Sequence, residues 1–414
     1  MTPTPLILAI AGDPGGAAAL APVLAALQAD KRTRVLALPY LQARDVWKLH
    51  RLECEAIDEE LSSAAIFERL QAARPALILT GTSVNALDLE RRFIAAAKTL
   101  GLPSLAVLDF WSNYSRRFSE SSQEALCLPD CVAVMDEQAH REMLAEGFPA
   151  ARMRITGQPA FDGLATLRLR FTSAQRQKLR AGLGVPERDR LIVFASQPLS
   201  TFYTELVDRS LHPGYDEQSV LAGLIRNLEA LARDTGTGMT LVIRPHPREM
   251  TEAFAQIHSP WIRTVVSFQE NARELLLSAD LVIGMTTVLL VEACHLACPT
   301  LSLQPGLRVP DVLPTNRLGL SRAVYRWEEL LPMLSGWLRN EPEWQAAQQS
   351  ITAWSPEGHA TERVVKLVYE MTQSNDSRAH EPDFKEARSG VLPCQERLEN
   401  DLSVLRGGDN PCPN

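Results

Sequence analysis

The sequence is poor in basic residues and in aromatic residues. It holds 42 lysines and arginines against 50 aspartates and glutamates, a formal net charge of -8, and only 6% of its residues are aromatic. A protein that binds nucleic acid through its phosphates needs a positively charged surface, which this balance does not provide. We therefore expect no nucleic-acid partner.

The sequence also lacks a clear export or membrane-spanning signal. The apolar stretch from Leu6 to Leu27 has no basic residue before it, and Asp13-Pro14-Gly15-Gly16 interrupts it. A second apolar stretch, residues 281–301, contains a glutamate, a histidine and a proline, which make it too polar to cross a bilayer. We expect a cytoplasmic protein.

Cysteines are few and show no metal-binding pattern. The seven cysteines include two pairs four residues apart, Cys127/Cys131 and Cys294/Cys298, and neither pair stands in a cluster with zinc-ligand spacing. Small buried hydrophobic side chains explain them better. No Asp-x-Asp pattern follows a predicted strand either, so we expect no metal and no cofactor.

The N-terminal part of the chain alternates short apolar runs with helix-like stretches. Continuous apolar runs are typical of parallel strands that are covered on both faces, and their alternation with helices predicts a doubly wound α/β sheet. The predicted strands are Leu6–Ala11, Arg34–Leu38, Ala76–Leu79, Ser104–Leu108 and Cys131–Met135, and the predicted helices are Ala17–Gln28, Ala64–Ala73, Leu87–Leu100 and Glu137–Glu146.

A second series of the same kind follows a connector near residue 160. Its predicted strands are Leu191–Ala195, Thr240–Ile243, Ile262–Val265, Leu281–Ile283 and Thr300–Leu303, and its predicted helices are Asp216–Asp234, Ala272–Ser278, Val288–His295 and Trp327–Arg339. We therefore predict two Rossmann-like domains, residues 1–160 and 161–355, that face each other across a cleft. A helix over residues 356–372 would cross back to the first domain, and residues 373–414 would form a disordered tail.

Ligands of open parallel sheets collect at the carboxyl ends of the strands, and the first candidate segment there is Gly12–Gly16. Gly15 and Gly16 would let the backbone approach a ligand closely, and the helix that follows offers unpaired N–H groups to an anion. A plain tight turn explains these glycines about as well, and the G-x-G-x-x-G spacing of a dinucleotide site is not met.

The second candidate is Arg244-Pro245-His246-Pro247-Arg248, which directly follows a predicted strand. Two prolines fix the backbone around a histidine with cationic neighbours, and an arginine can bind a phosphate through two hydrogen bonds. We interpret Arg244 and His246 as phosphate-binding residues. The alternative is a surface loop with incidental basic charge.

The third candidate runs from Gly284 to Glu292 and joins a strand to a helix. A diphosphate at that helix start would meet backbone N–H groups, the hydroxyls of Thr286 and Thr287, and the positive end of the helix dipole. Glu292 lies in an otherwise apolar helix, where a buried carboxylate needs a partner. A ribose diol would serve, and so would a basic residue of the other domain.

The fourth candidate is Asp109, which follows a strand of the first domain and precedes Phe110 and Trp111. A carboxylate at a strand end can act as a general base, and aromatic residues beside it suit stacking on a sugar ring. An aspartate that caps a local turn is the alternative.

The order of these segments resembles that of the GT-B glycosyltransferases and of the related UDP-N-acetylglucosamine 2-epimerases. Within that group the sequence is similar to the capsule and teichoic-acid-type transferases, which carry Pro-His-Pro after a strand. The resemblance covers residues 5–372. The residues that carry it are Gly12–Gly16, Thr156–Pro159, Arg244–Pro247 and Ala279–Gly284 together with Glu292 and Ala293.

The sequence departs from the epimerase pattern at the acid and base positions. Thr80–Asn85 stands in place of a His-Gly-Asp-Thr stretch, Ser196 and Gln197 stand in place of a His-Arg pair, and Asp109 replaces a His-x-Glu-Ala-Gly stretch. Epimerisation of this type needs groups that remove and return a proton. These replacements argue against 2-epimerase activity.

The resemblance implies a glycosyltransferase that moves a sugar from a nucleotide-sugar donor to a surface-glycan or glycolipid acceptor. It implies that the C-terminal domain binds the donor, with substrate-binding residues Ser196, Gln197, Arg244, Thr286, Thr287 and Glu292. It also implies two catalytic residues: His246, which stabilises the leaving diphosphate, and Asp109, the general base on the acceptor side, where Gly15 and Gly16 give close backbone access. Because acceptors in such families are often linked to lipids, the resemblance is compatible with a peripheral contact to a membrane. The alternatives are a nucleotide-sugar isomerase, epimerase or hydrolase, and a non-catalytic protein that binds a nucleotide sugar.

Overall fold

A computed structural model describes residues 4–119, 125–204, 212–250, 254, 257–354 and 358–378. The chain divides into two compact units, one made of Met1–Asp162 with His359–Asn414 and the other of Gly163–Gly358. Each unit holds one six-stranded parallel sheet within these residues. The α/β class with two parallel sheets that the apolar runs predict is confirmed.

The sheet of the first unit has the strand order β2-β1-β3-β4-β5-β6. Its strands are β1 (Leu6–Ala11), β2 (Arg34–Pro39), β3 (Leu77–Thr80), β4 (Ser104–Val107), β5 (Cys131–Val134) and β6 (Met153–Ile155). The helices of this unit are α1 (Pro14–Ala29), α2 (Ala43–Leu49), α3 (Ser63–Ala73), α4 (Leu89–Leu100), α5 (Glu137–Ala145) and α15 (Ala360–Arg378).

Strand β1 shows why continuous apolar runs form this sheet. Successive side chains of a strand point to opposite faces. Ile7 and Ala9 belong to the core that contains α1 and α15, whereas Leu8 and Ile10 belong to the core that contains α3 and α4. Both faces are covered, so no polar residue alternates with the apolar ones.

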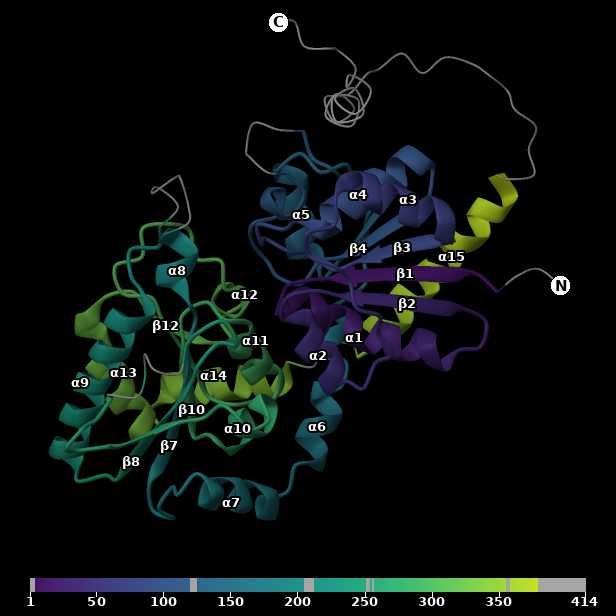
Figure 1. Ribbon diagram of the computed structural model, residues 1–414. Coiled ribbons are helices and arrows are strands. Elements are labelled where there is room, and N and C mark those ends of the chain that lie inside the picture. The colour runs from purple at the N-terminus through teal and green to yellow at the C-terminus, as the bar shows by residue number, and fades with distance from the viewer. Residues whose placement is uncertain are drawn as a thin grey trace, which may run out of the picture. The chain divides into compact units, whose positions relative to one another are not determined.

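The C-terminal helix α15 belongs to the first unit, although the second unit separates it from the rest of that unit in sequence (Figure 1). Val364 and Val368 are fully buried in the core that contains α1. The connector motif holds the start of α15, because the Asp162 carboxylate accepts hydrogen bonds from the Ala360 and Thr361 amides at 3.0 and 2.7 Å. The helix continues past residue 372 to Arg378, and the rest of the predicted tail lies outside the described residues.

The second unit has the strand order β12-β11-β10-β7-β8-β9. Its strands are β7 (Arg190–Ala195), β8 (Met239–Arg244), β9 (Arg263–Val266), β10 (Leu281–Gly284), β11 (Thr300–Leu303) and β12 (Arg322–Val324). Its helices are α6 (Leu164–Arg170), α7 (Ser173–Gly182), α8 (Leu199–Thr204), α9 (Glu217–Thr235), α10 (Ala272–Ser278), α11 (Val288–His295), α12 (Pro314–Arg317), α13 (Trp327–Leu338) and α14 (Pro342–Ala353).

The sequence missed the edge strands β6 and β12. Each is three residues long and contains an arginine, and in each only one of the three residues is buried. An edge strand has a neighbour on one side only and needs no apolar run, so apolar patterning cannot reveal it. Within the described residues, no helix combines the length and the apolar character that a bilayer span requires.

Candidate functional site

The register of the second sheet brings three candidate segments to one edge. Ala195 of β7 pairs with Arg244 of β8 on one side and with Gly284 of β10 on the other. The three strands therefore end at the same level. The residues that follow, Ser196, Gln197, His246, Thr286 and Thr287, together with Arg244, are called the strand-end cluster below.

Gln197 links the loop after β7 to the loop after β10. Its side-chain oxygen accepts a hydrogen bond from the Thr286 amide at 2.8 Å and lies 3.4 Å from the Thr286 hydroxyl. Gln197 thus holds the loop between β10 and α11 in place. It also takes up the Thr286 N–H, which lies just before the start of α11.

The start of α11 is set by Thr287. This residue is the N-cap, and its hydroxyl accepts a hydrogen bond from the Leu289 amide at 3.3 Å. Gly284 lets the loop pack closely, because a Cβ at this position would lie 3.0 Å from Thr287 Cγ2 and 3.1 Å from the Ala195 carbonyl oxygen. The hydroxyl groups of Thr286 and Thr287 therefore lie next to the N-terminus of α11.

Glu249 holds the Arg244–Arg248 turn, and the sequence interpretation missed it. Its carboxylate accepts hydrogen bonds from the His246 amide at 2.6 Å and from the Ser196 hydroxyl at 2.7 Å. Burial raises the pKa of Glu249. A glutamate three residues after a turn residue is the spacing of a capping box, and this signal could have revealed it.

The histidine of this turn has a defined hydrogen-bonding arrangement. His246 Nδ1 accepts a hydrogen bond from the Arg248 amide at 3.1 Å. The neutral imidazole therefore carries its proton on Nε2. The guanidinium of Arg244 is half-buried and donates to the Ser267 carbonyl at 3.2 Å, and burial lowers its pKa.

Glu292 has a partner that the sequence did not suggest. Arg273 of α10 donates to Glu292 Oε1 from NH2 at 2.8 Å and from Nε at 3.3 Å. The glutamate side chain is 9% exposed. The basic partner belongs to the same unit, not to the other domain as the alternative interpretation held.

In the first unit, the carboxylate of Asp109 forms an ion pair. Asp109 follows β4 and pairs with Arg117, whose side chain is 6% exposed. The Thr82 hydroxyl donates to Asp109 Oδ1 at 2.7 Å and also accepts from Arg117 at 3.1 Å. Burial raises the pKa of Asp109, and Arg117 opposes that rise.

The space beside Gly15 and Gly16 is filled by protein. A Cβ at Gly15 would lie 2.2 Å from Asp109 Oδ2, and one at Gly16 would lie 3.0 Å from the Thr82 carbonyl oxygen. Asp109 and the backbone after β3 thus lie against the Cβ positions of these two glycines, and the role of Gly15 and Gly16 toward a ligand stays a prediction. Helix α1 also begins earlier than expected, at Pro14.

A buried carboxylate beside this loop escaped the sequence interpretation. Glu90, 3% exposed, accepts hydrogen bonds from the Gly12 amide at 2.9 Å and from the hydroxyls of Tyr40 and Ser83. Burial raises its pKa to about 7. Asp13 adjoins it and accepts from the Val84 amide at 3.0 Å. No local pattern marks Glu90, because the tertiary fold alone buries this first-turn residue of an amphipathic helix.

No model of a known protein family matches the sequence, and no curated protein matches it. Solved structures match over most of the chain. The UDP complex of MnaA from Staphylococcus aureus has a TM-score of 0.66 at 15% identity, covering 92% of this chain and 100% of that one. The UDP-GlcNAc complex of UDP-GlcNAc 2-epimerase from Neisseria meningitidis has a TM-score of 0.63 at 15% identity, covering 88% and 100%. HepE of Anabaena with UDP-glucose has a TM-score of 0.58 at 14% identity, covering 90% and 99%.

The chain has the GT-B fold. The resemblance that the ordered motifs indicate is confirmed at this level, since the matching structures include both UDP-GlcNAc 2-epimerases and a glycosyltransferase from Rickettsia africae. A shared fold does not establish a shared reaction, so the chemistry has to be argued from the residues of this chain.

Proposed function

We propose that this protein is an enzyme that acts on a nucleotide sugar, and that it transfers the sugar to a glycan or glycolipid acceptor. The observation that carries the proposal is the strand-end cluster, in which Arg244, His246, Thr286 and Thr287 meet at the carboxyl edge of β8 and β10. Several of the matching solved structures hold UDP or a UDP-sugar.

The cluster suits a diphosphate. Arg244 supplies a fixed positive charge, His246 accepts at Nδ1 and so presents Nε2 as its donor, and the threonine hydroxyls lie at the positive end of α11. Donors placed where negative charge develops lower the barrier to departure of a nucleoside diphosphate. Glu292, oriented by Arg273, is our proposed ribose ligand.

The residues at the positions where the epimerases carry acid and base groups favour transfer over epimerisation. Ser196 donates to Glu249 and Gln197 accepts from Thr286, so neither is placed to abstract a proton from a sugar carbon. Asp109 is the one carboxylate that we propose as a general base on the acceptor side. This role requires it to act from within its pair with Arg117.

Nucleotide binding can be tested by thermal unfolding with UDP-, GDP-, CMP- and dTDP-sugars. We expect one class to raise the Tm by several degrees, because a ligand at 100 times its Kd stabilises the folded state by about 2.7 kcal/mol. Arg244→Ala and Thr286→Ala should abolish most of that shift. The matched controls Arg170→Ala and Thr166→Ala change exposed residues of α6 and should retain it. A full shift in Arg244→Ala would refute the proposed binding site.

Incubation of the enzyme with the nucleotide sugar that it binds, without an acceptor, separates transfer from epimerisation. We expect the sugar to keep its configuration, because the residues that would remove and return a proton at a sugar carbon are replaced here. The products can be followed by NMR. Accumulation of an epimer would assign the enzyme to the isomerases and leave the proposed binding site intact.

A further inference from the structure

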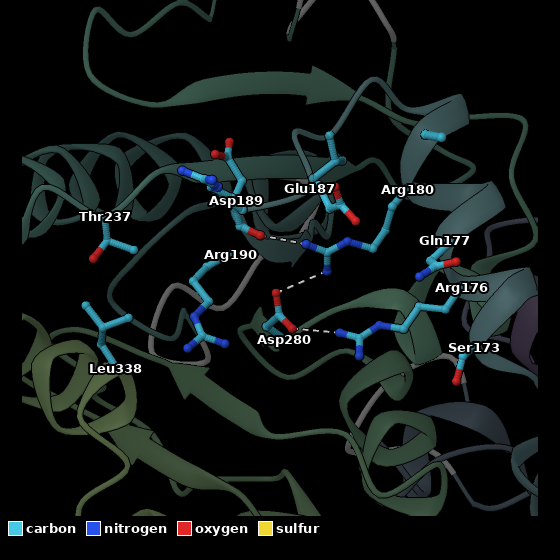
Figure 2. A pocket seen from close by; sticks show the side chains of 13 residues that line it. Ser173, Arg176, Gln177, Arg180, Glu187, Asp189, Arg190, Thr237, Asp280 and Leu338 are labelled. Atoms are coloured by element: carbon cyan, nitrogen blue, oxygen red, sulfur yellow. Dashed lines mark hydrogen bonds and ion pairs between the residues drawn. The ribbon is translucent and has the colours of Figure 1, made fainter.

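A cavity of about 920 Å³ lies at the opposite edge of the second sheet from the strand-end cluster (Figure 2). Arg190 is the first residue of β7, Asp280 precedes β10, and Thr237 precedes β8, so the cavity opens at the amino ends of these strands. Helix α7 contributes Arg176 and Arg180 to its wall.

Two of the arginines of this cavity are held rigidly around one carboxylate. Arg176 and Arg180 donate to the two oxygens of Asp280 at 2.6 and 3.1 Å, and the Leu191 amide donates to Asp280 at 2.7 Å. Arg180 also donates to the Asp189 carbonyl at 2.6 Å. Two guanidinium groups thus share one carboxylate, which leaves an excess of positive charge at a fixed position.

Two further arginines of the wall, Arg188 and Arg190, are exposed. Within the described part of the chain, their guanidinium groups have no hydrogen-bond or ion-pair partner. Figure 2 shows Arg190 on one side of Asp280, with Arg176 and Arg180 on the other. The group of Arg176, Arg180 and Asp280 is therefore adjoined by two more positive side chains, Arg188 and Arg190, which can turn toward a ligand.

The carboxylates of the wall can bind the uncharged, hydroxyl-bearing part of a ligand whose anionic part the arginines bind. Four arginines face three carboxylates, Glu187, Asp189 and Asp280. Asp189 accepts from the Thr240 hydroxyl at 2.8 Å and so keeps a fixed orientation. Carboxylates accept hydrogen bonds from sugar hydroxyls, and Val185 and Leu338 add apolar surface.

We propose that this cavity is a second ligand site, which binds the di- or triphosphate group of a small phosphorylated molecule. Guanidinium groups bind phosphate oxygens through paired, charge-assisted hydrogen bonds. The cavity volume lies within the range of sites for nucleotide-sized ligands. The site is separate from the strand-end cluster and does not depend on the reaction proposed there.

The test is calorimetric titration of the full chain with inorganic tripolyphosphate at low ionic strength. We expect saturable binding that Arg188→Ala/Arg190→Ala weakens by at least about tenfold. The exposed control Arg170→Ala should leave the titration unchanged. The strand-end variant Arg244→Ala removes binding at the strand-end cluster and should retain the binding event of this cavity. Both arginines of the double variant are exposed, so its Tm should match that of the parent.

The charge-retaining variant Arg188→Lys/Arg190→Lys should recover part of the affinity, since lysine keeps the charge but loses the paired geometry. Three results would each overturn the proposal: no saturable binding by the parent protein, unchanged affinity in the double alanine variant, or loss of all binding in Arg244→Ala alone. The last result would place the anion at the strand-end cluster.

Discussion

Glu90→Gln is expected to remove the decline of stability with rising pH that Glu90 contributes between about pH 4.5 and pH 7. Burial raises the pKa of Glu90 from 4.5 to about 7 in the folded protein. Between these values the folded state binds a proton that the unfolded state has lost, so stability falls as the pH rises. The full loss is about 3 kcal/mol, at about 1.4 kcal/mol for each pH unit.

Glutamine can replace Glu90 without leaving its partners unsatisfied. Its oxygen can accept from the Gly12 amide and the Ser83 hydroxyl, as Glu90 Oε1 does. The Tyr40 hydroxyl would then accept from the glutamine amide and donate to Asn85, whose side-chain oxygen lies 3.3 Å away. The variant should therefore be at least as stable as the parent at pH 8.

The measurement is urea unfolding of both proteins at half-unit steps from pH 4.5 to pH 8. Glu68→Gln, which changes an exposed glutamate of α3, is the matched control and should keep the parent's slope. The difference in unfolding free energy between Glu90→Gln and the parent should grow by about 3 kcal/mol from pH 4.5 to pH 7. If that difference did not change with pH, Glu90 would not be a group that titrates in this range.

Asp109→Ala is expected to cost about 3–5 kcal/mol of stability, because it leaves a buried arginine without its counter-ion. Arg117 is 6% exposed, and Asp109 and Thr82 bind its guanidinium. Asp109→Ala/Arg117→Met should recover most of the loss, since apolar side chains can replace a buried ion pair at little cost. Asp234→Ala, at an exposed position in α9, is the control.

The double variant also distinguishes the two roles open to Asp109. If Asp109 is a general base, transfer requires it. The double variant, although its stability is recovered, would then bind the nucleotide sugar but transfer the sugar at least about 100-fold more slowly. A double variant that regains both stability and turnover would show that Asp109 acts only through its pair with Arg117. Denaturant unfolding and transfer assays on the same preparations provide both readouts.

The sequence predicted positions along the strands better than it predicted partners between them. Parallel strands end at a common edge, so the adjacency of Ser196, Arg244 and Thr286 could be expected from three short apolar runs. The ion pair between Arg273 and Glu292 could not be expected, because the residues lie on different helices, and apolar patterning does not say which side chains of α10 and α11 face each other.

Burial of charged residues was the hardest feature to predict. Glu90 and Arg117 stand beside other charged residues in the sequence, as solvated surface residues do, yet each is at most 6% exposed. Groups that follow β1, β2 and β3 bind Glu90, and groups that follow β3 and β4 bind Arg117. Such burial has no local signature where the partners include residues distant in sequence, as Gly12 and Tyr40 are from Glu90 and Thr82 is from Arg117.

The position of α15 has a consequence for the order in which the chain folds during synthesis. Val364 and Val368 fill the core beside α1 and β1, and Asp162 binds the first amides of the helix. The ribosome completes residues 163–358 before it delivers α15, so the second unit can reach its native state while the first still exposes an apolar groove. Until then, that groove is a surface that a chaperone or a premature contact between nascent chains can occupy.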